Sequence, residues 1–297
     1  MSGQIVRVGS RESRLAVIQS EVILNWIREN CPEIGTELVT MKTSGDRVLN
    51  RALEELGGKG LFVKELDRAL LEGRTDLSVH SLKDLPMETP PELPVLGFTR
   101  REDPRDVLVL PQGVAEWDRS KPVGCASRRR AIQLRRLWPE VRVELIRGSV
   151  ETRLRKLDEG QYGATILAAA GLKRLGLETR ISRFFTPEEM LPAAGQGILA
   201  VQGRLGLDYG WLSGCFDREG ACCALAERAF VRALGGGCSS PVAAYAVPEG
   251  EQLWLRGFYS EPDGTGCWFG ELRGDAGEAE KLGLKLARKW KEETHGR

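Results

Sequence analysis

The sequence predicts an α/β protein with two α/β domains and a smaller α+β domain at its carboxyl end. Its 297 residues exceed the usual size of a single hydrophobic core. Segments typical of strands and helices alternate through the first two thirds, which indicates parallel sheets covered by helices. The last third has three strand-like runs in succession, which is typical of an antiparallel sheet.

Short β-branched or apolar runs predict the strands of the first two domains, and apolar residues at helical spacing predict the helices. In the first set, we expect strands at 5–9, 37–41 and 77–80, a helix capped by Ser13 and a helix at 64–72. In the second set, we expect strands at 107–110, 122–125, 141–147 and 164–168, and helices at 129–138 and 150–159.

Changes in composition mark the domain boundaries. Prolines within 90–94 and the charged run 100–106 separate the two sets of elements. A strand predicted at 197–201 is expected to return to the first domain. The last part is expected to contain a helix at 221–234, a Gly-rich loop, strands at 242–247, 252–259 and 266–273, and a closing helix through Trp290. The expected domains are 1–98 with 193–216, 99–192, and 217–297.

Charge and composition argue against several classes of protein. The formal net charge of +1 gives no general attraction to polyanions, so nucleic acid is not an expected partner. We find neither an apolar run of about eighteen residues nor a signal-peptide pattern, so we expect a cytoplasmic protein with no membrane contact. Seven cysteines without a C-x-x-C pair, and two histidines, argue against a zinc site. Walker, dinucleotide-binding and G-x-S-x-G patterns are not found in a suitable context.

Arginine outnumbers lysine by 32 to 11. A guanidinium pairs with a carboxylate through two hydrogen bonds, so a carboxylate-rich ligand favours arginine, although a GC-rich genome has the same effect. Cations usually avoid the starts of helices unless an anion binds there, and this placement favours the ligand interpretation. The arginines at the starts of predicted elements are Arg11, Arg14, Arg128, Arg129, Arg130, Arg147 and Arg153.

Two further residues could carry chemistry. Asp84 follows Lys83 at the carboxyl end of a predicted buried strand, where parallel α/β sheets bind ligands. A carboxylate there can move a proton or stabilise a forming cation, and an ordinary turn residue is the alternative. Cys238 follows three glycines that leave room for a bulky group, and its thiolate could hold a carbon atom covalently. The alternative for Cys238 is a glycine-rich helix end with an incidental cysteine.

Seven segments form an ordered set along nearly the whole chain. They are V-G-S-R-E-S-R-L-A at 8–16, G-G-K-G-L-F-V-K-E-L at 57–66, D-L-S-V-H-S-L-K-D-L-P at 76–86, R-E-D-P-R-D at 101–106, L-A-A-A-G-L-K-R-L-G at 167–176, P-A-A-G-Q-G at 192–197 and G-G-G-C-S-S-P-V at 235–242. Together they resemble the porphobilinogen deaminase (hydroxymethylbilane synthase) family. The chain departs from the family's usual pattern at Ala126, Arg128, Ser149, Glu151, Cys223 and Gly235.

The resemblance implies a fold and a reaction. Two domains of the type-2 periplasmic-binding-protein kind would face each other across a cleft, and a third domain with a three-stranded antiparallel sheet would carry Cys238. A dipyrromethane primer would be attached to Cys238 through a thioether. Porphobilinogen would lose ammonia and be joined head to tail onto the primer, and hydroxymethylbilane would be released. The family also implies a monomer that uses no metal.

The resemblance also implies roles for individual residues. Asp84 would be the catalytic group. Besides Cys238, the primer would be bound by Lys83, Ser127, Arg129, Arg130 and Arg147. The substrate would be bound by Arg11, Ser13, Phe62, Arg153, Arg174 and Gln196. Two other hypotheses are a two-domain anion receptor and a thiol switch built on Cys222, Cys223 and Cys238. The receptor needs neither Asp84 nor Cys238, and no redox motif supports the switch.

Overall fold

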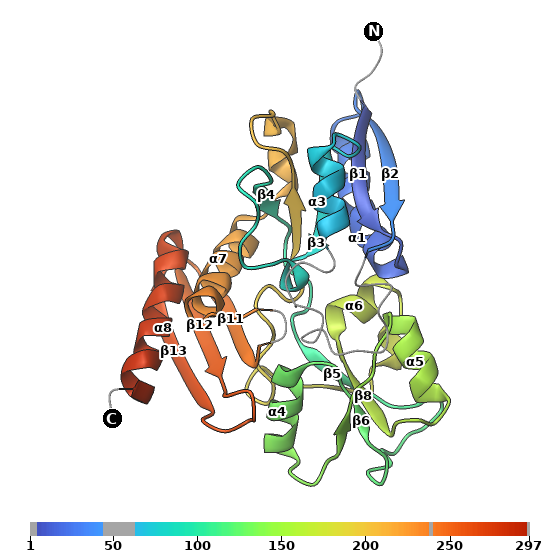
Figure 1. Ribbon diagram of the computed structural model, residues 1–297, viewed down its shortest axis with the longest axis vertical. Helices are drawn as coiled ribbons and strands as arrows, with labels where there is room; N and C mark the ends of the chain where they lie inside the picture. Colours follow the sequence, from blue (N-terminus) through green and yellow to red (C-terminus); the bar gives the residue numbers. More distant parts are fainter. Residues whose placement is uncertain (1–4, 44–62, 238–239, 296–297) are drawn as a thin grey trace.

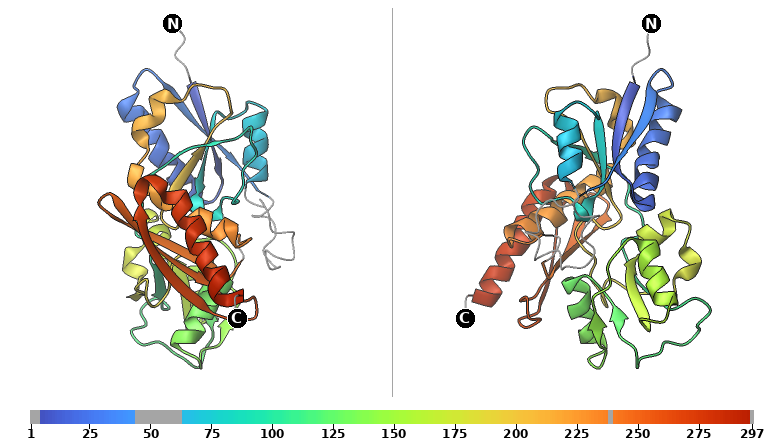
Figure 2. Two further views of the ribbon diagram at one scale, coloured as in Figure 1. Left: turned by 90° about the vertical axis from the view of Figure 1, so that its left-hand side faces the viewer. Right: turned by 45° about the vertical axis from the view of Figure 1, so that its right-hand side comes forward.

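The computed structural model describes residues 5–43, 63–237 and 240–295, which form three sheets (Figure 1). Two of the sheets have five strands, and the third has three. Both views in Figure 2 place the third sheet and its helices beside the junction of the other two. The predicted class, two α/β units with a smaller antiparallel α+β unit, is confirmed.

The first sheet has the strand order β2-β1-β3-β10-β4. Its strands are β1 (Ile5–Arg11), β2 (Gly35–Met41), β3 (Leu77–Ser81), β4 (Val95–Phe98) and β10 (Leu199–Gln202). It is accompanied by α1 (Arg14–Asn30), α3 (Lys64–Leu71) and the short 3-10 helices η2 (Leu82–Asp84) and η4 (Gly210–Cys215). Ser13 caps α1 by accepting a hydrogen bond from the Ala16 amide, as its sequence position predicts.

The second sheet has the strand order β7-β6-β8-β5-β9. Its strands are β5 (Asp106–Val109), β6 (Val123–Gly124), β7 (Val143–Glu144), β8 (Ala164–Ala168) and β9 (Arg183–Phe184). Its helices are α4 (Arg128–Leu137), α5 (Val150–Asp158), α6 (Ala169–Arg174) and the 3-10 helix η3 (Glu178–Arg180). The strand expected at 141–147 is shorter, because β7 lies at the sheet edge and pairs with β6 at two positions.

Both large sheets are mixed, so the expectation of parallel sheets holds only for β1, β2 and β3 in the first and for β6, β7 and β8 in the second. Strand β10 is antiparallel to β3 and β4, and β5 is antiparallel to β8 and β9. Both strands follow a crossover from the other sheet, so they do not arrive through a strand–helix–strand unit, which is the connection that makes neighbours parallel. The predicted return of the segment near 197–201 to the first sheet is confirmed by β10.

The third unit is an antiparallel sheet of β11 (Val242–Glu249), β12 (Gln252–Tyr259) and β13 (Trp268–Asp275). Helix α7 (Arg218–Ala233) and helix α8 (Ala279–His295), which follows the short η5 (Ala276–Glu278), pack against each other and the sheet. Helix α7 begins earlier than expected because Asp217 accepts a hydrogen bond from the Gly220 amide and caps it.

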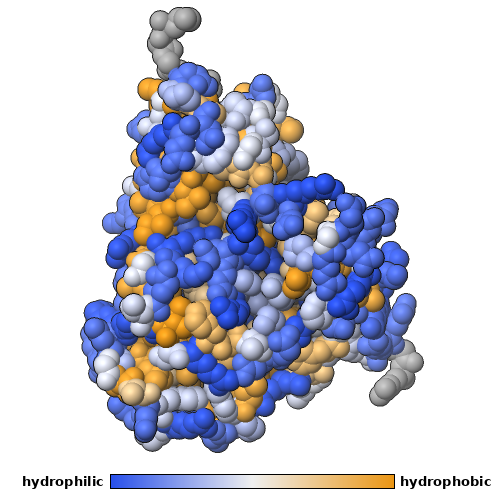
Figure 3. Space-filling view, turned by 180° about the vertical axis from the view of Figure 1, so that it is seen from behind, coloured by the Kyte–Doolittle hydropathy of each residue, from blue (hydrophilic) through white to orange (hydrophobic). Residues whose placement is uncertain are grey.

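The two large sheets are joined by two crossovers, 99–105 and 185–198. At Gly197 φ is +92°, and a Cβ there would lie 2.2 Å from the Glu102 carbonyl oxygen, so glycine lets the crossovers run close together. The predicted domain bounds, 1–98 with 193–216, 99–192 and 217–297, remain a proposal. Among the described residues, no helix is long and apolar enough to cross a membrane. The face opposite to Figure 1 is mostly hydrophilic, with apolar residues in separate patches (Figure 3).

A buried carboxylate attaches the third unit to both crossovers. Glu227 on α7 is fully buried, and its Oε1 lies 2.6 Å from Arg101 Nη2 in the first crossover. Its Oε2 accepts a hydrogen bond of 2.7 Å from the Gly195 amide in the second crossover. The Ala246 amide of β11 donates to Oε1 at 2.7 Å. Burial raises the pKa of Glu227, and Arg101 opposes this shift.

Removal of the Glu227 charge should destabilise the protein, because Arg101 would stay buried without its partner. We expect Glu227→Gln to lower the free energy of unfolding by about 3–5 kcal/mol, measured by urea unfolding. The exposed pair of Arg232 and Glu280 provides the matched control, since Glu280→Gln should cost less than about 1 kcal/mol. Equal effects of the two substitutions would contradict this account of domain attachment.

Candidate active site

The predicted site residues meet in one cavity of about 550 Å³ at the junction of the three units. Those that line it are Arg11, Ser13, Lys83, Asp84, Ser127, Arg129, Arg130, Arg147, Arg153, Arg174 and Gln196. Phe62 and Cys238 lie outside the described residues. Gly237 and Ser240, on either side of residues 238–239, also line the cavity. The structure therefore gathers residues from distant parts of the sequence around one space.

Three helices begin at the cavity, and each is capped by a serine. Ser13, Ser127 and Ser149 accept hydrogen bonds from amides in the first turns of α1, α4 and α5. All three serines line the cavity. The partial positive charge of a helix start favours anions, so the helices add to the charge of the arginines. The sequence analysis gave Ser13 and Ser127 a binding role, but it named Ser149 only as a departure from the family's usual pattern.

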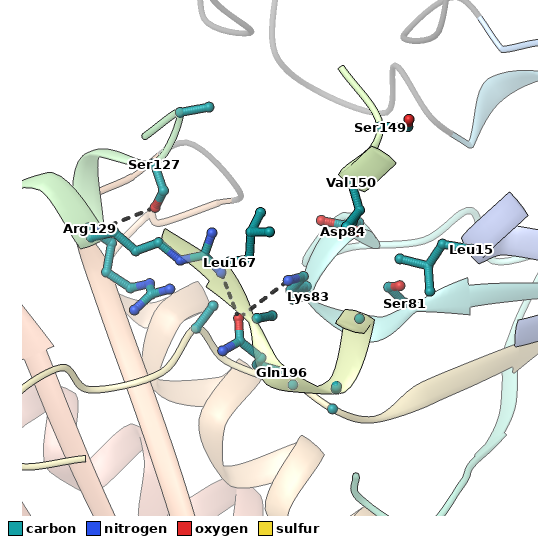
Figure 4. A pocket seen from close by; sticks show the side chains of 18 of the residues that line it. Leu15, Ser81, Lys83, Asp84, Ser127, Arg129, Ser149, Val150, Leu167 and Gln196 are labelled. Atoms are coloured by element: carbon teal, nitrogen blue, oxygen red, sulfur yellow. Dashed lines mark hydrogen bonds between the residues drawn. The ribbon is translucent and has the colours of Figure 1, made fainter. Parts of the chain in front are cut away.

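Asp84 is held at the cavity by its apolar neighbours. It ends η2, directly after the buried strand β3, and the flanking Leu82 and Leu85 are buried in the core. Below it, Gln19 Nε2 donates to Ser81 Oγ at 2.8 Å, which fixes the end of β3. The Asp84 side chain itself is exposed, and Figure 4 shows it at the cavity opposite Arg129. A carboxylate so placed can reach a ligand without moving the backbone.

Lys83 lies beside Asp84 and reaches across to the second crossover. Its Nζ donates to Gln196 Oε1 at 3.3 Å (Figure 4). Burial lowers the pKa of Lys83 to about 8, although the negative charge of Asp84 opposes the shift, and Arg130 adds to it. The ammonium therefore sits in a site where losing its proton is unusually easy.

Arg129 and Arg130 are both buried at the start of α4, and a residue that the sequence analysis missed lies between them. Arg129 Nη1 and Arg130 Nε donate to the two oxygens of Asp106, at 2.7 and 3.0 Å. Gln196 Nε2 donates to Asp106 Oδ1 at 2.9 Å. Burial would raise the pKa of Asp106, but the two guanidiniums outweigh it and hold the pKa far below its usual value. Asp106 is in the quoted segment 101–106, yet its sequence position does not reveal these partners.

Two other cavity arginines make contacts with the backbone. Arg153 Nε donates to the Gly148 carbonyl oxygen at 2.9 Å, and Arg174 Nη2 donates to the Gly197 carbonyl oxygen at 2.7 Å. Burial lowers the pKa of Arg153 to about 10, and the positive charge of Arg130 adds to the shift. Hydrogen bonds to the backbone therefore hold both side chains in place at the cavity in the absence of a ligand.

The lining is suited to a ligand with several carboxylates and a flat apolar body. Among the described lining residues, seven are cations and two, Asp84 and Glu151, are carboxylates. Leu15, Leu167 and Val150 supply apolar surface between the charged groups (Figure 4). Within the described ranges, no group of three His, Cys, Asp or Glu residues could hold a metal ion.

Comparison with known proteins agrees with this lining. The family model "porphobilinogen deaminase, dipyromethane cofactor binding domain" matches residues 6–208, and the model "porphobilinogen deaminase, C-terminal domain" matches 221–292. The chain belongs to the porphobilinogen deaminase family. Its matches include the porphobilinogen deaminase of Acetivibrio thermocellus, with 52% identity over 95% of this chain and 96% of that protein. The porphobilinogen deaminase of Alkaliphilus oremlandii is also 52% identical, over 98% of this chain and 99% of the relative.

Solved structures also align with the chain, at low similarity. One is the periplasmic aliphatic sulphonate binding protein SsuA of Escherichia coli, with 12% identity and a TM-score of 0.40. The match covers 79% of this chain and 71% of that one. Similarity at this level has no bearing on the reaction, which the porphobilinogen deaminase family defines as hydroxymethylbilane synthesis.

The lowered pKa of Lys83 predicts an alkaline limit to activity, because Lys83 is one of the cations expected to hold the primer against which the substrate reacts. Its charge is present below about pH 8 and is lost as the pH rises through that value. We expect kcat/KM to fall above about pH 8. The Lys83→Met variant should be less active at neutral pH, and its kcat/KM should not show this fall at alkaline pH. Lys285→Met, at an exposed site in α8, is the control and should retain the wild-type profile. If kcat/KM of Lys83→Met falls above about pH 8 as it does in the wild type, Lys83 is not the group that sets the alkaline limit.

Proposed function

We propose that this cleft deaminates porphobilinogen and joins the units head to tail on a dipyrromethane primer, releasing the linear tetrapyrrole hydroxymethylbilane. The excess of cations around the exposed Asp84 carboxylate carries this proposal. Each pyrrole of substrate and primer bears an acetate and a propionate, so a growing chain presents many carboxylates. Guanidinium groups pair with these in a fork geometry, and the helix starts add favourable charge.

The chemistry of the lining fits the dipyrromethane group. Its carboxylates would be bound by Lys83, Ser127, Arg129, Arg130 and Arg147, all of which line the cavity. Its covalent anchor would be Cys238, and the lining residues Gly237 and Ser240 bring both flanks of that loop segment to the cavity. When bound, the group supplies the free pyrrole carbon to which the first substrate unit is joined.

The incoming substrate would be bound by the remaining predicted residues. Arg11, Arg153 and Arg174 offer guanidinium groups, and Ser13 and Gln196 offer a hydroxyl and an amide. In this structure Arg174 Nη2 donates to the Gly197 carbonyl oxygen, and Gln196 makes four protein contacts. Arg174 would therefore bind the substrate with its remaining N–H groups. Both N–H groups of the Gln196 amide are engaged, on the Pro104 carbonyl oxygen and Asp106 Oδ1, so Gln196 would exchange one of these contacts to bind the substrate. Phe62 would cover one face of a pyrrole.

Asp84 would stabilise the positive charge that deamination creates. The bond from the aminomethyl carbon to nitrogen breaks, and ammonia leaves with the bonding electrons. The pyrrole nitrogen then shares the positive charge left on the carbon. The Asp84 carboxylate would accept a hydrogen bond from the pyrrole N–H. This interaction is stronger in the transition state, where the ring carries positive charge, than in the ground state. After the new carbon–carbon bond forms, a proton leaves the joined carbon, and Asp84 could receive it.

The protein is further proposed to act as a cytoplasmic monomer that binds neither nucleic acid nor membrane. One chain provides cavity residues from all three units, so a second subunit is not needed to complete the site. The six cysteines within the described ranges are all free, as expected in a reducing compartment. Light scattering of the purified protein would test the monomer, with a mass near 32.8 kDa expected.

Replacement of Asp84 by asparagine should remove most of the activity. The amide has nearly the same shape but lacks the negative charge, so it would not stabilise the cation. We expect Asp84→Asn to lower kcat at least about 100-fold, measured as formation of hydroxymethylbilane from porphobilinogen. The mass of the intact chain should still include the primer, because primer binding rests mainly on other residues.

The matched control is Glu88→Gln, an exposed carboxylate four positions along that does not line the cavity. It should keep wild-type kcat. Wild-type turnover in a primed Asp84→Asn variant would contradict the role of Asp84. Tight binding of porphobilinogen by the wild-type chain without any turnover would instead indicate the anion receptor.

A further inference from the structure

Asp106 is a fully buried carboxylate outside the cavity lining, and its position controls two residues that line it. It begins β5, immediately after the first crossover. Its Oδ2 accepts from Arg129 Nη1 at 2.7 Å, and its Oδ1 accepts from Arg130 Nε at 3.0 Å. Gln196 Nε2 donates to Oδ1 from the second crossover. One carboxylate thus connects the start of α4 to both crossovers.

The two arginines differ in what they can still bind. Arg130 uses all three nitrogens within the protein: Nε on Asp106, Nη1 on the Ile166 carbonyl oxygen and Nη2 on Gln196 Oε1. Its Nη2 also lies 2.8 Å from Asp106 Oδ1. Its Nη1 still has one N–H beyond these contacts, so Arg130 can add at most a minor contact to the primer.

Arg129 keeps free donors. Its Nη1 donates to Asp106 Oδ2 and to the Leu191 carbonyl oxygen, at 2.7 and 2.6 Å. Its Nε and Nη2 have no hydrogen-bond partner in the part of the chain that the structure describes. Figure 4 shows Arg129 at the edge of the cavity, beside Ser127. Of the two neighbouring guanidiniums, Arg129 is the one that can bind a carboxylate through Nε and Nη2 without breaking a hydrogen bond within the protein.

We propose that Asp106 is a positioning residue that prepares this arginine pair for the primer. It engages Arg130 as an internal support and leaves Arg129 as the arginine whose free N–H groups meet a primer carboxylate. The proposal deepens the proposed function and rests on it. Two buried guanidiniums side by side repel each other, and burial opposes the charge of each. One Asp106 carboxylate balances one of them, so the pair retains about one uncompensated positive charge for a ligand anion.

This arrangement couples Asp106 to the primer. Without Asp106, two buried cations lack a fixed counter-charge, which is strongly unfavourable in the unprimed protein. A bound primer brings carboxylates to the same place and replaces part of the missing charge. Loss of Asp106 should therefore harm the unprimed protein more than the primed one. A residue that served only the fold would affect both forms equally.

The test compares the thermal midpoints of primed and unprimed protein for the wild type and Asp106→Asn. Unprimed chains are made without porphobilinogen and then incubated with it, and the intact mass verifies the state of each sample. We expect Asp106→Asn to lower the midpoint of the unprimed protein by at least about 5 °C more than that of the primed protein. Equal falls in both forms, with a normal mass gain, would overturn the role of Asp106 alone. A wild-type chain that gains no mass would overturn the proposed function as well.

Two controls separate charge from general damage. Asp103→Asn removes the partner of Arg105 in the same crossover, away from the cavity lining, and should change both forms equally. If unprimed Asp106→Asn does not fold, the double variant Asp106→Asn with Arg130→Met decides the matter, because it restores the charge balance. Recovery of folding in the double variant supports the proposal, and failure to recover overturns it.

Discussion

The site depends on how the protein keeps several positive charges buried together. A desolvated guanidinium or ammonium is unfavourable unless hydrogen bonds and counter-charges surround it. Asp106 provides this for Arg129 and Arg130, and the Gly197 carbonyl oxygen provides it for Arg174. The cavity can therefore hold more cations than carboxylates before a ligand arrives. The ligand that completes the balance must be an anion, which is the physical reason that a carboxylate-bearing pyrrole fits.

The same contacts join the parts of the molecule. Gln196 Oε1 accepts from Lys83, which follows a strand of the first sheet, and from Arg130, on a helix of the second. Glu227 connects both crossovers to the third unit, and α7 leads from it toward the loop that precedes Cys238. The ligand-binding cations Lys83 and Arg130 are thus hydrogen-bonded directly to one of the segments that join the two large sheets. Charge balance and domain arrangement are set by one network.

Much of this could be predicted from sequence because local rules govern it. Ser13 at a helix start, the apolar spacing of α1 and the bounds of β12 all follow from short-range patterns, and the structure agrees. The family, its enzyme class and its dipyrromethane cofactor are also confirmed by the matched family domains. The individual roles of the site residues stay predictions, including those of Phe62 and Cys238 outside the described residues.

What the sequence did not reveal depends on partners distant along the chain. The antiparallel direction of β10 follows from a crossover between sheets, which periodicity does not encode. In the sequence, Asp106 is one charge among several in a charged segment. Its partner Arg130 on α4 lies 24 residues further along the chain, so the contact is visible only in the folded structure. Arg130 resembles its neighbour Arg129 in sequence, yet the structure gives one a supporting position and the other free donors.

The most direct test of the account is the mass of the intact, denatured chain, made unprimed without porphobilinogen, before and after incubation with porphobilinogen, followed by peptide mapping. The account predicts a covalent gain that corresponds to a dipyrromethane and maps to Cys238. Because the anchor and the cations must act on one ligand, a chain that gains no mass would contradict the account. An adduct on one of the other six cysteines would contradict it equally.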